Sequence, residues 1–371
     1  MTGALPRHTL VRPDGRRLHV YGELRGSLPP GGTTRGDVSR LHRRWDALSG
    51  TWVAISPARN TRPGGAPAPA TGAPACPLCP GGPEVPFSYQ AAVFDNAFPT
   101  FAADAPSVGD DPWLARSTGT CEVVLYTQAH VGSLATLPPE DLGRVVAVWC
   151  DRSDELWADP AHAAVMIFEN RGAEIGATLS HPHGQIYAFP HLPPLLAQRV
   201  AVLDRHRAEH HACLTCAVLE RDDRSPERQV AGNPTFAVTV PFAARWPYEV
   251  RVRARHHGVR RLGDLDGPGR SDLAVAVQDV VRRFDALWDF ELPYMMAILE
   301  APPGADDWHL TVEFLPPHRS ADKLKVRASV ETVTGLFIND TVPEESAARL
   351  AATAPEPSGR TVEVPVVVRI T

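Results

Sequence analysis

The chain has 371 residues, 43% of them hydrophobic and 22% charged, which is ordinary globular composition for one large domain or two medium ones. Its 37 Lys and Arg side chains against 43 Asp and Glu give a formal net charge of −6 without a cationic run, so nucleic acid is excluded as the expected partner. No apolar stretch approaches the roughly 20 residues of a membrane span and no secretory signal is recognisable, so we expect a soluble cytoplasmic protein.

Short strand-like pieces separated by Gly/Pro turns open the chain, and residues 1–45 are predicted to form a hairpin beside the main body. Further strands are predicted over residues 51–56, 91–96, 120–127, 164–170 and 183–190. A Pro-Pro pair followed by acidic residues introduces the predicted helix over residues 142–158.

The second half of the chain repeats this order of elements. We predict helices over residues 196–217 and 273–289, and strands over residues 236–242, 248–255, 294–301 and 308–315. Residues 346–371 are predicted to form a short helix, a Pro/Gly linker and a final strand. Antiparallel strands with one crossover helix in each half indicate an α+β fold.

Four of the six cysteines form two CxxC pairs, which in a long chain without an export signal indicate metal ligands or redox centres rather than disulfides. Each pair is followed by two histidines, 51 residues apart in the first half and 52 in the second. The possible ligands are Cys76, Cys79, His130 and His181, and then Cys213, Cys216, His257 (or His256) and His309. The matching order supports an internal duplication.

The most informative stretch is FENRGAEIGATLSHPHGQIYA, residues 168–188. His181 and His183 are two residues apart, so on a strand both side chains lie on one face. One imidazole can then hold a metal while its neighbour is presented to a substrate. Gly172 and Gly176 would let backbone amides approach an anion closely.

Two segments of this stretch, FENRGAEIG and SHPHGQIY, closely resemble the signature of the galactose-1-phosphate uridylyltransferases, the transferase branch of the histidine-triad superfamily. The resemblance extends over roughly residues 42 to 345, through SPARNTRP, CPLCPGG, VFDNAFP and RSADKLKVRASVE. It implies a duplicated histidine-triad-like fold, with an antiparallel half-barrel sheet and helices packed outside. The halves would be residues 46–195, with the HPHGQ run and a zinc site, and residues 196–345, between the N-terminal hairpin 1–45 and the tail 346–371.

The resemblance implies a ping-pong reaction through a covalent intermediate. His183 matches the nucleophile that attacks the α-phosphorus of UDP-glucose, and galactose-1-phosphate then takes the uridylyl group in a second displacement. A neutral imidazole suits this role because it is nucleophilic near pH 7. Gln185 replaces the third histidine of the hydrolase branch; it can donate a hydrogen bond to a phosphoryl oxygen but cannot shuttle protons, which favours transfer over hydrolysis.

The resemblance also implies a set of substrate-binding positions, some of them contributed across a homodimer interface. The cationic positions across the interface are Arg59, Arg62 and Lys325; the nucleoside pocket is Leu78, Phe94 and Asn96; the positions near the phosphates are Asn170, Gly176 and Thr178; and the hexose carboxylate is Glu331.

Cys76, Cys79, His130 and His181 match the structural zinc site of the family, a closed tetrahedral site that would position the catalytic strand without joining the chemistry. The family's second metal, held by a Glu and three histidines, aligns with Arg199 (or Gln198), Leu299, Thr311 and Glu313, so we predict that this site is lost. A second zinc held by Cys213, Cys216, His257 and His309 is proposed by analogy; the alternative is a solvated CxxC with unrelated histidines. No redox cofactor is predicted, because no thioredoxin-like βαβ context surrounds the CxxC pairs.

The sugar side of the site departs from the family pattern. Val330 and Phe337 stand where Tyr and Gln occur, and Ala97 where Asp occurs. A pocket that loses hydrogen-bonding groups discriminates against its polar substrate. Two alternatives therefore stand beside galactose-1-phosphate uridylyl transfer: a nucleotidylyltransferase for another sugar-1-phosphate, such as a pentose, with an NTP donor, and a non-catalytic, zinc-stabilised nucleotide-binding protein.

Overall fold

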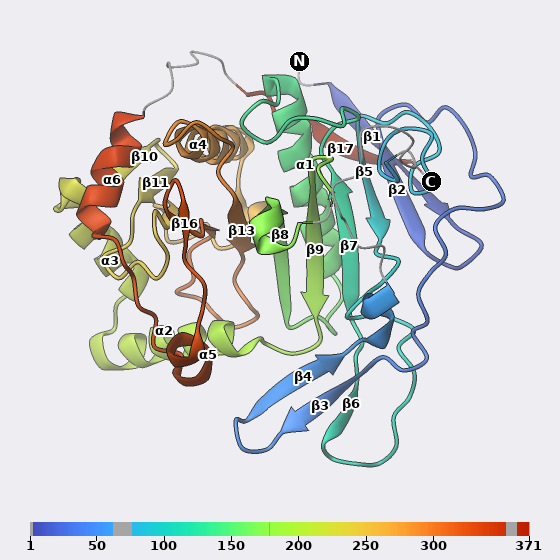
Figure 1. The fold of residues 1–371 in the computed structure, drawn as a ribbon, viewed down its shortest axis with the longest axis horizontal. Helices are drawn as coiled ribbons and strands as arrows, with labels where there is room; N and C mark the ends of the chain where they lie inside the picture. The colour runs from blue at the N-terminus through green and yellow to red at the C-terminus, as the bar shows by residue number, and fades with distance from the viewer. Residues whose placement is uncertain (1–2, 62–75, 178, 354–361, 371) are drawn as a thin grey trace.

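The computed structural model describes residues 3–61, 76–177, 179–353 and 362–370 (Figure 1). Its main feature is a sheet of 12 strands that runs through both halves of the chain. These strands are β1 (Ala4–Val11), β2 (Arg17–Tyr21), β5 (Ala91–Asp95), β7 (Thr120–Leu125), β8 (Ala164–Arg171), β9 (His183–Phe189), β10 (Gln229–Gly232), β11 (Phe236–Thr239), β12 (Val250–Ala254), β13 (Tyr294–Leu299), β14 (Thr311–Leu315) and β17 (Val366–Ile370). Their order across the sheet is β10-β11-β12-β14-β13-β8-β9-β7-β5-β2-β1-β17.

The two halves meet inside this sheet, where β8 of the first half pairs antiparallel with β13 of the second. Asn170 lies opposite Met295 and Met166 opposite Leu299. The other neighbouring strands are also antiparallel, except that β17 runs parallel to β1. The α+β class predicted from the sequence is confirmed.

Helices cover the sheet on both faces. They are α1 (Pro139–Trp157), α2 (Pro194–His210), α3 (Leu214–Asp223), α4 (Gly267–Asp285), α5 (Ser329–Thr334) and α6 (Pro343–Ala352), with short 3₁₀ turns η1 (Pro57–Thr61), η2 (Ala173–Ile175), η3 (Pro226–Arg228) and η4 (Leu262–Asp264). Figure 1 shows α1 running behind β8, β9 and β7. Its residue Trp149 shares one apolar core with Val281 of α4 and with Ile186 and Ile298 of the strands.

The opposite face of the sheet packs against α2. Leu299, the neighbour of Ile298 in β13, belongs to a separate apolar cluster with Leu203 of α2 and Trp308. Successive strand residues point to opposite faces, so one strand serves both layers. None of the helices in the described part of the chain is long and apolar enough to cross a membrane.

The single helix predicted over residues 196–217 is wrong, because the structure divides it into α2 and α3. The chain leaves α2 at His211, whose φ of 52° is in the left-handed region. α3 then begins at Leu214, capped by Cys213, whose Sγ accepts a hydrogen bond from the backbone N–H of Cys216. Helical periodicity continues through both pieces, so the sequence pattern alone gave no sign of the break.

Both chain termini join the main sheet. The hairpin β1–β2 extends it through the pairing of β2 with β5, and β17 adds an edge strand beside β1. Asp151 of α1 ties these strands to the core: Oδ2 accepts from Arg7 and from the Tyr21 hydroxyl, each at 2.7 Å, and Oδ1 accepts from Arg369 at 3.1 Å.

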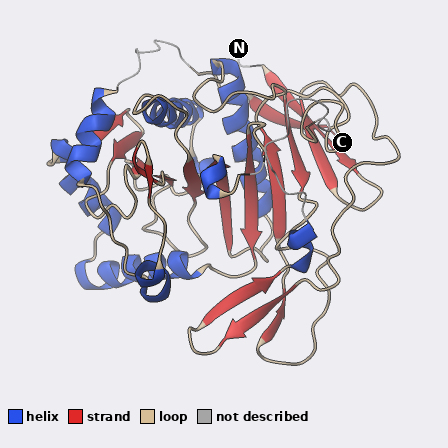
Figure 2. Ribbon diagram, viewed as in Figure 1, coloured by secondary structure: helices blue, strands red, loops and turns tan. Residues whose placement is uncertain are grey.

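Two small sheets lie outside the main one. The strands β3 (His42–Asp46), β4 (Thr51–Ile55) and β6 (Leu114–Arg116) form an arm that projects from the body, as Figure 2 shows. The strands β15 (His318–Ser320) and β16 (Lys323–Leu324) form a short hairpin that leads toward α5.

Candidate functional site

His183 is the first residue of β9, and its ring is held by the backbone two residues away. Its Nδ1 lies 2.7 Å from the carbonyl oxygen of His181. Because a carbonyl only accepts hydrogen bonds, Nδ1 carries the proton and the lone pair lies on Nε2. When the ring is neutral, this contact selects the tautomer in which Nε2 is the unprotonated nitrogen.

The remaining odd-numbered residues of β9 share the face of His183. Gln185 is half-buried like His183, whereas Gly184 and Ile186 are buried on the core face. Gln185 lies opposite Phe168 of β8 in the sheet register, and Asn170 follows Phe168 on the same face of that strand. His183, Gln185 and Asn170 are thus brought to one face of adjacent strands.

Arg59 reaches the far end of this strand in the same chain. From η1 its Nη1 lies 3.3 Å from the Tyr187 hydroxyl and 3.3 Å from Thr100 Oγ1. The Arg59 side chain is otherwise exposed. Arg62, its predicted companion, lies outside the described residues.

The loop between β8 and β9 turns on two glycines in the left-handed region, Gly172 with a φ of 104° and Gly176 with a φ of 80°. A Cβ at Gly172 would lie 2.6 Å from Pro293 Cβ, whereas Gly176 faces open space. Only glycine adopts these angles without strain. Thr178, the predicted phosphate contact of this loop, lies outside the described residues.

Of the residues predicted for the nucleoside pocket, Leu78 precedes β5, Phe94 belongs to it and Asn96 follows it. Leu78 and Phe94 belong to one apolar cluster and are each 3% exposed. The Asn96 side chain accepts a hydrogen bond from the Phe98 backbone N–H at 2.9 Å, which closes the turn after β5. Their contact with a nucleoside stays a prediction.

Lys325 and Glu331 lie in the second half of the chain and pair with each other. Lys325 Nζ donates to Glu331 Oε1 at 2.7 Å and to the Ile338 carbonyl oxygen, and it lies 5.7 Å from the Trp246 ring centroid. Both side chains are buried. Within one chain, these two side chains contact each other, Ile338 and Trp246, and these contacts involve no residue of β9.

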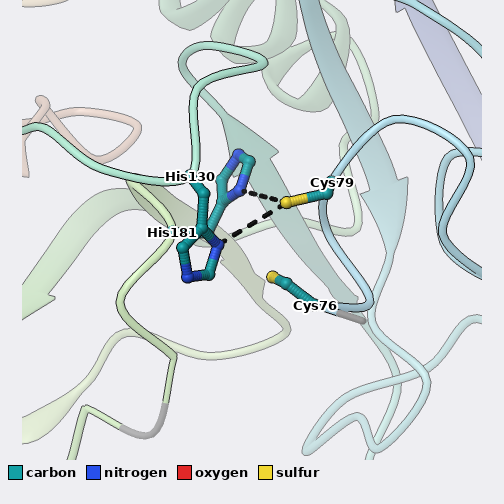
Figure 3. A group of neighbouring side chains, drawn as sticks. All are labelled: Cys76, Cys79, His130 and His181. Atoms are coloured by element: carbon teal, nitrogen blue, oxygen red, sulfur yellow. Dashed lines mark hydrogen bonds between the residues drawn. The ribbon is translucent and has the colours of Figure 1, made fainter. Parts of the chain in front are cut away.

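The first Cys/His group comes together beside the start of β9, and Figure 3 shows its four side chains. The ligand atoms of Cys76, Cys79, His130 and His181 all lie within 4.8 Å of one another. Cys79 Sγ lies 3.5 Å from His130 Nδ1 and 3.6 Å from His181 Nδ1. Tetrahedral zinc with ordinary Zn–S and Zn–N bonds would place sulfur and nitrogen about 3.5 Å apart, so this group fits the ion.

The protonation states in this group also suit a metal. His181 Nε2 lies 2.8 Å from the carbonyl oxygen of Thr127, so Nε2 carries the proton and Nδ1 directs its lone pair into the group. Burial lowers the pKa of His181, which keeps the ring neutral as a ligand must be. Burial and the neighbouring Cys76 raise the pKa of the Cys79 thiol, an effect that a bound cation reverses.

The second Cys/His group repeats this arrangement in the other half. Its members are Cys213, Cys216, His257 and His309, whose ligand atoms again lie within 4.8 Å of one another. His309 Nε2 lies 3.5 Å from each sulfur, and its Nδ1 lies 2.8 Å from the carbonyl oxygen of Ala254. Cys216 Sγ lies 3.9 Å from His257 Nδ1. Both groups could hold a metal.

An ion pair occupies the position that aligns with the other metal of the family. Arg199 of α2 donates to Glu313 Oε1 of β14 at 2.6 Å. Burial alone would raise the pKa of Glu313, but Arg199 and Arg251 outweigh it and lower the pKa to about 2. A guanidinium offers no lone pair to a metal, so these residues do not form a ligand set.

Some contributors to the site were not predicted from the sequence. Tyr187, which meets Arg59, shares the alternation of His183 and Gln185, so strand periodicity was a usable signal. The carbonyls of Thr127 and Ala254 orient His181 and His309 of the two Cys/His groups. These contacts come from backbone atoms, which the residue pattern does not reveal.

The comparisons with known proteins cover both halves. The profile of the galactose-1-phosphate uridyl transferase N-terminal domain matches residues 33–193, and that of the C-terminal domain matches residues 200–356. The chain is 38% identical over 327 residues to the galactose-1-phosphate uridylyltransferase of Thermotoga maritima, a match that covers 85% of this chain and 99% of that protein. It is 37% identical over 297 residues to the enzyme of the same name from Streptomyces lividans, with 75% and 79% covered.

Solved structures agree. A structure described as a uridylyltransferase superposes with a TM-score of 0.76 at 29% identity, covering 84% of this chain and 98% of that one. An ADP-glucose phosphorylase from Arabidopsis thaliana, at 21% identity and a TM-score of 0.63, covering 83% and 97%, shares the fold. The protein is therefore one of a class of two-domain α+β nucleotide-transfer enzymes. The chain belongs to the galactose-1-phosphate uridylyltransferase family, which confirms the resemblance noted in its motifs.

Proposed function

We propose that this protein transfers UMP between UDP-glucose and galactose-1-phosphate through a uridylyl group carried on Nε2 of His183. The observation that carries this proposal is the hydrogen bond from His183 Nδ1 to the His181 carbonyl at 2.7 Å. This bond fixes the tautomer in which Nε2 is the nucleophile, and it faces the positive charge that the ring acquires when it is uridylylated.

Each half-reaction exchanges one bond at the α-phosphorus. In the first, the lone pair of His183 Nε2 forms a P–N bond while the P–O bond to the β-phosphate breaks, and glucose-1-phosphate leaves with that electron pair. In the second, a phosphate oxygen of galactose-1-phosphate attacks the same phosphorus and the P–N bond breaks, which returns neutral His183. No proton has to move, so Gln185 serves as a hydrogen-bond donor to a phosphoryl oxygen rather than as an acid.

We further propose that zinc occupies both Cys/His groups. Zinc would supply closed, four-coordinate structural sites and no open position for substrate. The first group contains His181, whose backbone carbonyl holds the ring of His183. The orientation of the His183 ring therefore depends on His181, a member of the first Cys/His group, through the backbone carbonyl of His181.

A homodimer is proposed from the surface around α5. Five apolar side chains of this segment, which we call the α5 surface, are half or more exposed: Val326, Val330, Val333, Leu336 and Ile338. Apolar side chains gathered on an exposed segment mark an interaction site. Arg59 is exposed near β9, so a second copy could bring this cation to the diphosphate, as the family pattern implies; Lys325 lies in the same segment as the α5 surface but is buried and paired with Glu331.

A second acceptor sugar is favoured by one observation. The Phe337 ring lies 4.8 Å from the guanidinium carbon of Arg327 and 5.3 Å from that of Arg245. The ring packs between two guanidinium groups where the family has a Gln amide, and a phenyl side chain has neither the N–H donors nor the carbonyl acceptor with which that amide would bind a hexose hydroxyl. The alternative is nucleotidylyl transfer to another sugar-1-phosphate.

The test is an intact-mass measurement of the full chain after incubation with UDP-glucose, UTP or ATP. We expect a gain of one UMP from UDP-glucose, its loss on addition of galactose-1-phosphate, and no gain in His183→Ala. His210→Ala, an exposed histidine on α2, is the matched control and should be labelled like the wild type. A gain only from a triphosphate, discharged by another sugar-1-phosphate, would favour the alternative reaction with an NTP donor, and labelling of His183→Ala would overturn the mechanism.

A further inference from the structure

A buried polar cluster lies behind the catalytic strand, on the sheet face opposite His183. It consists of Tyr126, just after β7, Glu169 of β8 and Tyr294 of β13, and we call it the Glu169 cluster. The Tyr294 hydroxyl donates to Glu169 Oε1 at 2.8 Å. The three side chains are between 0% and 6% exposed, so they meet inside the apolar core beneath α1 and α4.

Tyr126 touches the catalytic strand on both sides of His183. A Cβ added to Gly184 would lie 2.2 Å from the Tyr126 hydroxyl oxygen and 3.0 Å from its Cζ. The phenol end therefore lies directly against the backbone between His183 and Gln185. The Tyr126 backbone N–H also donates to the Pro182 carbonyl at 3.4 Å.

The carboxyl of Glu169 is the acceptor available to this tyrosine. Glu169 Oε2, the Tyr126 hydroxyl and Trp149 Nε1 are all buried without a hydrogen-bond partner among the described residues. The Tyr126 and Trp149 rings pack edge to face at 6.0 Å. Buried polar groups require partners, and here two donors and one carboxyl oxygen gather at one place.

We propose that Glu169 is a positioning residue for the transfer reaction: together with Tyr294 it fixes Tyr126, and through Tyr126 it holds the backbone of Gly184, which sets His183 and Gln185 relative to each other. This inference rests on the function proposed above, because it concerns the same two side chains. The proposal assigns a role in that function to Glu169, which lies on the sheet face opposite His183 and does not touch substrate.

The cluster also gives the site a pH dependence. Burial raises the pKa of Glu169 to about 7, against Tyr294, Arg171 and Tyr126, which lower it. Arg171 is held by Asp285 of α4 at 2.9 Å and by Glu291 at 3.0 Å. As pH rises through about 7, Glu169 therefore becomes charged in an apolar core and the cluster loosens.

The direction in which pH changes the stability of the fold follows from the same raised pKa of Glu169. A carboxyl whose folded-state pKa is raised favours the native state while it is protonated. This contribution is complete below the ordinary pKa of 4.5 and is lost as pH rises to about 7. Activity should fall over the same pH range, which forms the alkaline limb of the profile of labelling rate against pH.

The experiment compares Glu169→Gln and Glu169→Leu in single-turnover labelling by UDP-glucose across pH. Glu169→Leu should slow formation of the UMP adduct about 100-fold with KM little changed, because a small displacement of the reacting groups costs that much. Glu169→Gln keeps an acceptor and a donor, so it should restore the rate and flatten the alkaline limb. Glu300 is another buried carboxyl, which accepts a hydrogen bond from Ser153, so Glu300→Gln is the matched control. It should leave the labelling rate and the alkaline limb of its pH profile unchanged.

The ¹⁵N resonances of the His183 ring provide a readout that does not depend on activity. They should shift in Glu169→Leu, return toward the wild type in Glu169→Gln, and stay unchanged in Glu300→Gln. Wild-type rate and resonances in Glu169→Leu would overturn the proposal, as would equal slowing in all three variants. Absence of any adduct in the wild type, with the ring still responding to Glu169→Leu, would instead overturn the proposed function alone.

Discussion

At Gly184, the absence of a side chain lets Tyr126 reach the backbone of the catalytic strand. A Cβ there would lie 2.2 Å from the Tyr126 hydroxyl oxygen and 3.1 Å from the Phe168 carbonyl oxygen, and Tyr126 is fully buried and cannot move away. Gly184→Ala should therefore lower the free energy of unfolding by about 2 kcal/mol, the usual cost of overpacking a core. Urea denaturation of the two proteins would measure this difference.

Removing the opposing hydroxyl should relieve that cost. In the Gly184→Ala background, Tyr126→Phe should recover part of the lost stability, so the two changes would be non-additive. Gly267→Ala is the matched control, because no atom lies within 4 Å of a Cβ at that position. Strictly additive effects of the Gly184 and Tyr126 substitutions would contradict this account of the contact.

At the scale of elements, each Cys/His group joins segments that the sheet alone leaves separate. The second group brings the start of α3 close to the end of β12 and the start of β14, through Cys213, Cys216 and the histidines that border those strands. The purified protein should contain about two zinc ions per chain. Cys216→Ser should leave about one, lower the apparent melting temperature by about 5 °C or more, and speed amide exchange in α3.

The two groups should differ in what they do to catalysis. Cys216→Ser should still form the His183 adduct, because its group holds α3 rather than β9. Cys79→Ser should lose the other ion and the adduct together, since His181 links that group to His183. Metal analysis and intact mass on the same samples would separate these outcomes, and an unlabelled Cys216→Ser protein would contradict the division of roles.

At the scale of the whole molecule, the α5 surface and the exposed Arg59 point to sites completed between two copies. Val333, which is 81% exposed, is the natural position to disrupt such a contact. Val333→Glu should convert a dimer to a monomer in analytical ultracentrifugation, because a carboxylate buried in an apolar interface costs more than the contact supplies. Its adduct formation should fall about 100-fold if the partner supplies charge to the diphosphate.

Mixed dimers give the matching control. Arg59→Ala and His183→Ala chains should each be inactive, and unfolding and refolding them together should restore about a quarter of wild-type activity, since half of the dimers would carry one intact site. Arg40→Ala, an exposed arginine before β3, should remain active alone. No recovery in the mixture would mean that Arg59 acts within its own chain, where it already meets Tyr187.

Much of the fold followed from local patterns. The residue pattern predicted a strand over residues 183–190, which the structure contains as β9, and the Pro-Pro pair with acidic residues marked the start of α1. The helix predicted over residues 196–217 was wrong, because its break depends on the left-handed turn at His211 that delivers Cys213 and Cys216 to distant histidines. Periodicity reports which face is buried, and it does not report where a chain must turn to reach a distant partner.

The candidate site divides in the same way. The order and spacing of the cysteines and histidines were enough to assemble the two Cys/His groups, whereas His183 was chosen from the family resemblance. The expectation that His181 and His183 share one face of a strand is wrong, because β9 begins at His183 and the His181 side chain is buried before it. The Glu169 cluster required the folded sheet. Tyr126 follows β7, Glu169 lies in β8 and Tyr294 in β13, and they meet only when β7, β8, β9 and β13 are in register. Residues close together in the sequence therefore determine the metal-binding and nucleophilic side chains. The packing that positions them depends on contacts between segments more than a hundred residues apart, such as Tyr294 with Glu169.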